Sequence, residues 1–229
     1  MNVGFSHKTK DMTKFHEELV GKLVTEAKPL KRAPTAWKQW LLWLGFAVLV
    51  VAVSLALIGP QFELEEKLSD PASGGFLLLA FILSAFTAWM GIASSKPDFT
   101  PRTGPRVVAA GLALFLFAMP FLFFGGDTLS RVWDQNMADG WFCFRTVVLV
   151  AIPSWVMLGW LASGNASFHP AWTGAWLGAS AFLLGAGTIQ LHCARWESCH
   201  MLVDHLLPML VFIFIPIWAG GWWFSRWRK

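Results

Sequence analysis

The stretch from His192 to His205 concentrates the side chains of this sequence that can do chemistry. It holds two of the three cysteines and three of the six histidines, between two apolar runs. Thiolates and imidazoles are the ligands of soft or borderline ions such as Zn²⁺, Cu⁺ and Cd²⁺. No C-x-x-C or H-E-x-x-H pattern is present, and such side chains often bind only headgroups, water or backbone. The candidate ligands for zinc or a transient heavy metal are His192, Cys193, Cys199, His200, Asp204 and His205.

The three cysteines can also carry redox chemistry. Cys143 lies at the start of one apolar run, Cys193 follows another, and Cys199 precedes a third, so all three are expected at one end of a set of helices. A disulfide needs Cα atoms roughly 4.4 to 6.8 Å apart, which neighbouring helix ends can provide. A pair that contains Cys143 is expected, with Cys199 as the natural spare, and a sensing role for the cysteines is predicted. The alternatives are a permanent structural bridge or unpaired thiols buried among aromatic rings.

The elements that position these residues are predicted from composition. Of 229 residues, 55% are hydrophobic and only 14% are charged, whereas a soluble domain has about 25% charged residues. Apolar stretches of roughly 18 to 22 residues are long enough to cross a hydrocarbon core of ~30 Å as helices. The sequence therefore predicts an all-α integral membrane protein with a transmembrane domain at 37–225 and a basic tail at 226–229. Its six expected spans cover about 37–58, 74–94, 107–124, 142–162, 171–190 and 201–224.

The distribution of basic residues predicts the orientation in the membrane. An even number of spans places both termini on one side. The segment up to Lys38, the loop at 96–106 and the tail contain fourteen of the eighteen Lys and Arg residues. Because cytoplasmic loops are enriched in these residues, both termini are expected in the cytoplasm of a bacterium, with the chain in the inner membrane. The cysteines are then expected on the outer, oxidising side.

Residues 1–36 are predicted to form a cytoplasmic segment with one amphipathic helix, from Asp11 to Ala27. Its charged face offers the ion pairs Lys14–Glu17 and Glu18–Lys22 at helical spacing. Gly21 in the middle costs about 1 kcal/mol of helix stability, so the helix is expected to need a partner or a membrane surface. The apolar stripe that would bind the partner consists of Phe15, Leu19, Val20, Leu23 and Val24.

The same residues are also compatible with other classes of function. Asp204 is the only acidic residue set among the apolar residues of an expected span, which favours a proton relay or a small transporter or metal-handling protein. The cysteines favour a membrane thiol oxidoreductase, although the missing C-x-x-C pattern counts against it. No glycine-rich phosphate loop and no nucleophile–base set is present, so the prediction is a protein that is not an enzyme and has no resident cofactor.

Several short motifs resemble the NrsF-type membrane anti-sigma factors, the negative regulators of sigma F. They are Ala27-Lys-Pro-Leu-Lys-Arg32 after the first helix, Trp141-Phe-Cys143, Leu191-His-Cys193, an early His205 in the sixth span, and a Trp- and Arg-rich tail. The resemblance implies six spans and a cytoplasmic N-terminal segment that binds an extracytoplasmic-function sigma factor, without direct contact to nucleic acid. It also implies that Cys143 and Cys193 match the family's pair of outer-face cysteines implicated in stress or metal response. Cys199 and His200 are not part of the recognised pattern.

Overall fold

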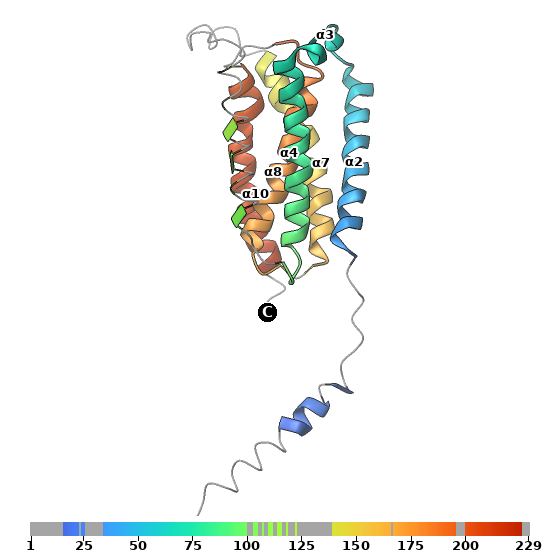
Figure 1. Ribbon diagram of the computed structural model, residues 1–229, viewed down its shortest axis with the longest axis vertical. Coiled ribbons are helices and arrows are strands. Elements are labelled where there is room, and N and C mark those ends of the chain that lie inside the picture. The colour runs from blue at the N-terminus through green and yellow to red at the C-terminus, as the bar shows by residue number, and fades with distance from the viewer. Residues whose placement is uncertain are drawn as a thin grey trace, which may run out of the picture. The chain divides into compact units, whose positions relative to one another are not determined.

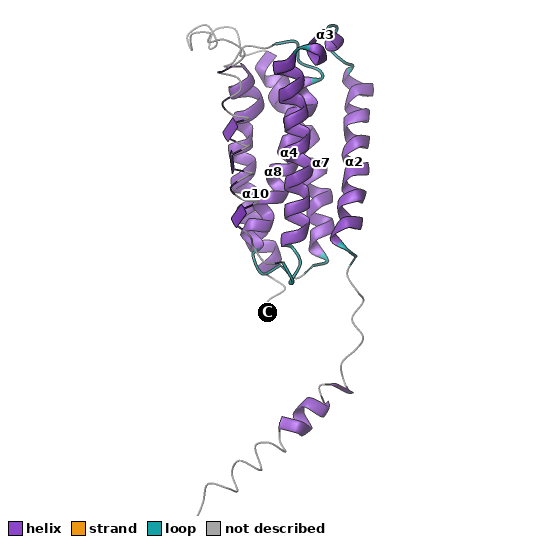
Figure 2. Cartoon of the chain, viewed as in Figure 1, coloured by secondary structure: helices purple, strands orange, loops and turns teal. Residues whose placement is uncertain are grey.

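The structure is a computed structural model that describes residues 16–22, 24–25, 34–99, 139–165, 167–195 and 200–225, with scattered positions between 103 and 122. The chain forms two compact units, residues 1–33 and 34–229, which are described separately. The described residues are helical and contain no strand (Figures 1 and 2), as the composition predicts. The elements are α2 (Ala36–Ile58), α3 (Leu64–Ser69), α4 (Pro71–Ser94), α7 (Asp139–Ser163), α8 (Pro170–Gln190), the π-helix η1 (Met201–Leu206) and α10 (Leu207–Ser225).

Helix α8 is the centre of the second unit. It packs against α4, α7 and α10, and fifteen of its 21 residues are buried. Glycine, alanine, serine and threonine make up much of its sequence, PAWTGAWLGASAFLLGAGTIQ, and such small side chains let helix backbones approach closely in a membrane. Helix α2 lies at the edge of the same bundle, where only 17% of its most apolar stretch is buried. Its apolar flank is therefore available to lipid.

The tightest helix contact lies between Gly174 of α8 and Gly220 of α10. A Cβ atom at Gly174 would overlap the carbonyl oxygen of Pro216 and lie 3.1 Å from the Cα atom of Gly220. We expect Gly174→Ala to destabilise the protein by about 1–3 kcal/mol, because the two backbones must separate. Thermal unfolding in detergent, followed by circular dichroism, measures the loss. Gly45→Ala is the matched control, since its Cβ meets nothing within 4 Å. Equal melting temperatures for the two variants would contradict this packing argument.

Three of the described helices, not six, are long and apolar enough to cross a membrane. They are α2, α4 and Trp141–Ser163 of α7, and they correspond to the first, second and fourth expected spans. Helix α8 has a similar length, but its many small and weakly polar residues lower its mean hydropathy. These residues suit its position, because most of its surface faces other helices. Composition therefore does not confirm the fifth expected span. The sixth corresponds to η1 and α10, part of whose side chains lie outside the description, as does most of the third, 107–124.

The expected loop between the first two spans contains a short helix. Leu64–Ser69 form α3, with Glu65 and Glu66 in its first turn and Lys67 in its last, where each charge suits the helix dipole. Asp70 then caps α4, because its Oδ2 accepts a hydrogen bond of 2.8 Å from the backbone N–H of Ser73. Helix α3 bears on function because it places Lys67 at the end of the bundle where the cysteines lie.

In the first unit, the described residues confirm part of the expected amphipathic helix. Residues 16–22 are helical, and Glu18 and Lys22 form the predicted ion pair at 3.3 Å. The side chains of Leu19, Val20 and Val24 are exposed. Phe15 and Leu23, the other members of the predicted apolar stripe, lie outside the described residues, as does Lys14 of the other predicted ion pair.

Candidate metal and redox site

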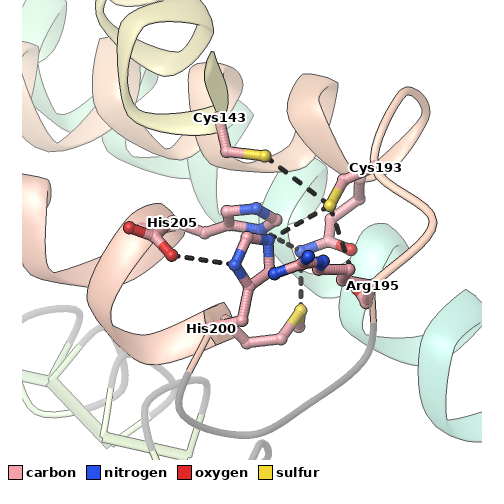
Figure 3. A network of polar contacts seen from close by, with 8 residues as sticks. Cys143, Cys193, Arg195, His200 and His205 are labelled. Carbon is pink, nitrogen blue, oxygen red and sulfur yellow. Dashed lines mark hydrogen bonds and ion pairs between the residues drawn. The ribbon is translucent and has the colours of Figure 1, made fainter. Parts of the chain in front are cut away.

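Two cysteines and two histidines from two distant parts of the sequence converge at one end of the bundle. Cys143 lies near the start of α7, Cys193 in the loop after α8, His200 directly before η1 and His205 near the end of η1. Figure 3 shows these side chains gathered together. All four are buried, with exposed fractions of 7% or less. We call these four residues the Cys₂His₂ cluster, and the end of the bundle that holds them the cysteine end.

The atoms that can act as ligands are close together. The Sγ atoms of Cys143 and Cys193 are 3.6 Å apart, and the Sγ atom of Cys193 is 3.2 Å from Nε2 of His200. One ligand atom from each member of the cluster lies within 4.8 Å of every other. Both cysteines are free thiols in this structure. The arrangement suits two kinds of chemistry, binding of a soft metal ion and oxidation of the two thiols.

The π-helix η1 explains why two histidines five residues apart reach the same site. In an α-helix, side chains five positions apart point about 140° away from each other. The wider turn of a π-helix, with i→i+5 hydrogen bonds, brings the fifth residue back above the first, and such turns are frequent at functional sites. The rings of His200 and His205 lie 4.9 Å apart between centroids. The π-helix therefore places both imidazoles in the cluster.

Polar groups behind the histidines orient both rings. The Oδ2 atom of Asp204 lies 2.8 Å from Nδ1 of His200, and the amide nitrogen Nε2 of Gln190 lies 2.6 Å from Nδ1 of His205. A carboxylate beside Nδ1 keeps a proton on that nitrogen, so Nε2 of His200, which faces Cys193, is the nitrogen that can bind a metal ion once it has lost its own proton. The Nε2 atom of His205 is buried and makes no hydrogen bond to any residue that the structure describes. A buried polar atom without a partner is uncommon and calls for an explanation.

Lys67 ties α3 to the loop that carries Cys193. Its Nζ atom donates hydrogen bonds to the backbone oxygens of Gln190, at 2.9 Å, and Cys193, at 2.7 Å. The residue is only 5% exposed, and this burial lowers the pKa of Lys67 to about 8. Because Gln190 is the last residue of α8, the lysine also offsets the negative end of that helix dipole.

The cluster distributes charge unevenly between its two sulfur atoms. The pKa of Cys193 is lowered, chiefly by the hydrogen bond that Cys143 donates and further by His200 and His205, although burial opposes this shift. Burial alone would lower the pKa of His200, but its hydrogen bonds with Asp204 and Cys193 outweigh this effect and raise the pKa to about 9. When one of the two thiols loses its proton, the negative charge is therefore favoured on Cys193, beside the two imidazoles.

The remaining candidates from the sequence lie elsewhere. The ring of His192 turns away from the cluster toward α2, where Nδ1–H donates to the carbonyl oxygen of Gly59 and Nε2 lies 2.8 Å from Oγ of Ser54. Asp204 contacts His200 and stands behind the cluster. Cys199 lies outside the described residues. The metal and redox roles of all these residues stay predictions.

Sequence reasoning missed Lys67 and Gln190. Gln190 is the one amide at the end of an otherwise apolar run, 171–190, and Lys67 is the one basic residue in the acidic stretch 61–72. A polar residue that differs from all its neighbours in this way often has a specific partner, so both positions could have been chosen from the sequence. Neither pattern, however, shows that the two residues meet beside a loop more than 120 positions after Lys67.

Comparison of the sequence with known proteins identifies the family of the chain. No curated protein and no solved structure matches the chain. The profile of the family described as NrsF, negative regulator of sigma F, matches residues 23–227 and so includes every member of the Cys₂His₂ cluster. The resemblance seen in the short motifs is thereby confirmed over most of the length, and it indicates a regulator of transcription rather than an enzyme. The chain belongs to the NrsF family of negative regulators of sigma F.

Proposed function

We propose that this chain is a membrane-bound anti-sigma factor of the bacterial inner membrane, which holds an extracytoplasmic-function sigma factor through residues 1–36. In this proposal the chain crosses the membrane six times with both termini in the cytoplasm, and redox or metal stress at the outer face changes its hold on the sigma factor. The family match carries the proposal, because it covers residues 23–227, which include the last part of the N-terminal segment and the whole of the cysteine end. The three strongly apolar helices and the bias of Lys and Arg support the membrane location and the orientation.

The input and the output of such a regulator must communicate along the bundle. The Cys₂His₂ cluster lies where α2 ends and α7 begins, whereas the N-terminal segment joins the other end of α2, at Ala36. A helix of 23 residues is about 35 Å long, enough to span the hydrocarbon core. Helix α2 is therefore the shortest covalent connection between the site and the segment that binds the sigma factor.

Contacts at the cysteine end support α2 as that connection. His192, next to Cys193 in the chain, binds Ser54 and Gly59 at the end of α2, and the N–H of Gln61 donates to the carbonyl oxygen of Leu191 at 3.0 Å. A metal ion that binds Cys193 would move this loop. So would a disulfide with Cys143, formed as two electrons and two protons pass to a peroxide. Either event changes the equilibrium only by its differential affinity for the two states of the regulator.

Co-purification from bacterial membranes tests the output half of the proposal. We expect the tagged full-length chain to retain a sigma factor, identified by mass spectrometry. Leu19→Asp and Val24→Asp each place a charge in the exposed apolar stripe. Each is expected to weaken retention at least about 30-fold, because losing an interface anchor costs about 2 kcal/mol or more. Glu18→Ala is the matched control, since it removes only an exposed ion pair worth about 0–1 kcal/mol. Failure of the wild-type chain to retain any sigma factor would contradict the proposal.

A further inference from the structure

The donor set at the cysteine end matches the coordination of a particular class of metal ion. Two sulfurs and two imidazole nitrogens are a common ligand set for Zn²⁺ in closed tetrahedral sites. With Zn–S near 2.3 Å and Zn–N near 2.0–2.1 Å, the ligand atoms of a tetrahedral site lie about 3.8 Å apart for S···S and about 3.6 Å for S···N. The observed separations are 3.6 Å between the sulfurs and 3.2 Å between Sγ of Cys193 and Nε2 of His200. The cluster is thus close to the size of such a site before any ion binds.

Two further observations point to a ligand. Within the described part of the chain, the Nε2 atom of His205 is buried and makes no hydrogen bond. It belongs to a cluster in which one ligand atom of each residue lies within 4.8 Å of the others. A metal ion would use its lone pair. The rings are also supported from behind, as metal-binding histidines usually are, with Asp204 beside Nδ1 of His200 and Gln190 beside Nδ1 of His205. In this structure the amide nitrogen of Gln190 lies 2.6 Å from Nδ1 of His205. Ligation through Nε2 puts the ring proton of His205 on Nδ1, so metal binding requires the amide of Gln190 to turn and present its oxygen there.

We propose that Cys143, Cys193, His200 and His205 bind one tetrahedral d¹⁰ cation, Zn²⁺ or Cd²⁺, as a closed four-ligand site that locks α7, the loop after α8, and η1 together. Both cysteines bind as thiolates and both imidazoles bind through a deprotonated Nε2, so the protons held on these four atoms leave as the ion enters, and the two thiolates balance its charge. A tetrahedral shell is complete with these four ligands, and the ring of His192 is engaged by Ser54 and Gly59 instead. The regulatory role of this metal site rests on the proposed function, whereas the assignment of its four ligands does not.

The test uses the full chain in detergent, reduced and stripped of metal with a chelator. Titration with Zn²⁺ against a chromophoric chelator gives the affinity and stoichiometry, and Co²⁺ as a spectroscopic probe gives the geometry. We expect one ion per chain, with the strong visible bands of tetrahedral Co²⁺ and a thiolate-to-cobalt charge-transfer band. Cys143→Ser and His205→Gln are expected to abolish these bands. Asp204→Asn, which keeps all four ligands, is expected to weaken Zn²⁺ binding about 10- to 100-fold.

Matched controls separate ligation from folding. His169→Gln changes an exposed histidine at the start of α8, at the other end of the bundle, and is expected to bind Zn²⁺ as the wild type does. Cys199→Ser is also expected to retain full binding, since four other ligands complete the shell. Circular dichroism checks that each variant is folded. Wild-type Zn²⁺ affinity in His205→Gln, loss of binding in Cys199→Ser, or no binding by the wild-type chain would overturn the assigned site.

The same preparations distinguish the failure of this site from failure of the proposed function. Retention of a sigma factor by the metal-free chain is measured in parallel. A chain that retains the sigma factor but binds neither Zn²⁺ nor Co²⁺ overturns the metal site and leaves the regulator in place. A chain that binds the ion with the expected spectrum but never retains a sigma factor confirms the site and removes its proposed regulatory role.

Discussion

Replacing either Cys143 or Cys193 by serine is expected to abolish the response of sigma-dependent transcription to cadmium or to a peroxide. Serine is close to cysteine in size, but its hydroxyl neither forms a disulfide nor serves as a thiolate ligand. Both positions are buried beside the two histidines of the cluster, so each substitution removes a thiol from the site itself. A reporter gene under the sigma-dependent promoter, assayed with and without the stress, measures the effect. The expected result is equal output under both conditions, in contrast to the wild-type chain.

Two further measurements show whether each variant is folded and present, so that a lost response is not mistaken for a lost protein. A buried hydroxyl without a good partner costs about 1–3 kcal/mol, and an unfolded regulator would release the sigma factor under all conditions. Immunoblotting of membranes and co-purification of the sigma factor show whether each variant is present and competent. His169→Gln serves as the control, with a wild-type response expected. If Cys143→Ser and Cys193→Ser respond as the wild type does, the two cysteines are structural and the signal enters elsewhere.

His192→Ala is expected to abolish the transcriptional response while leaving the Cys₂His₂ cluster able to bind Zn²⁺. The ring of His192 makes two hydrogen bonds to the end of α2, through Ser54 and Gly59, and none to the cluster among its described contacts. Each such bond contributes about 0.5–1.5 kcal/mol. The coupling energy between two sites in a regulated protein is typically about 1–3 kcal/mol. Loss of both bonds is therefore comparable with the whole coupling, because α2 has few other buried contacts at its edge of the bundle.

The measurement pairs the reporter assay with Zn²⁺ titration of the purified variant. Ser54→Ala, which removes one of the two partners, is expected to give an intermediate response, and His192→Gln to restore part of it by keeping a polar contact. A wild-type response in His192→Ala would show that the signal does not pass through α2. Loss of Zn²⁺ binding in the same variant would instead show that His192 supports the cluster directly.

The sequence alone predicted much of the fold because long apolar runs have few structural solutions. Alanine, leucine and phenylalanine over about 20 residues form helices in a membrane, where every backbone polar group must be satisfied within the segment. Hence the starts and ends of α2, α4, α7 and α8 fall within a few residues of the expected spans. Composition was less informative about which helices cross the membrane. Three described helices, rather than six, are apolar enough to do so by themselves. Helix α8 is not among them, because it consists largely of small residues that pack against other helices.

For the site, the sequence alone determined the chemistry, whereas the tertiary structure decided which candidates meet. Residue types and spacing placed Cys193, His200 and His205 in one stretch and marked Cys143 as their distant partner. The π-helix η1, which turns two histidines five residues apart toward one another, depends on packing against α7 and α10 and leaves no sequence signature. The same holds for the turn of His192 toward α2 and for the reach of Lys67 across to the loop of Cys193. Local sequence specifies helices and reactive groups, but the position of one helix end beside another is set by long-range packing, which no single segment encodes.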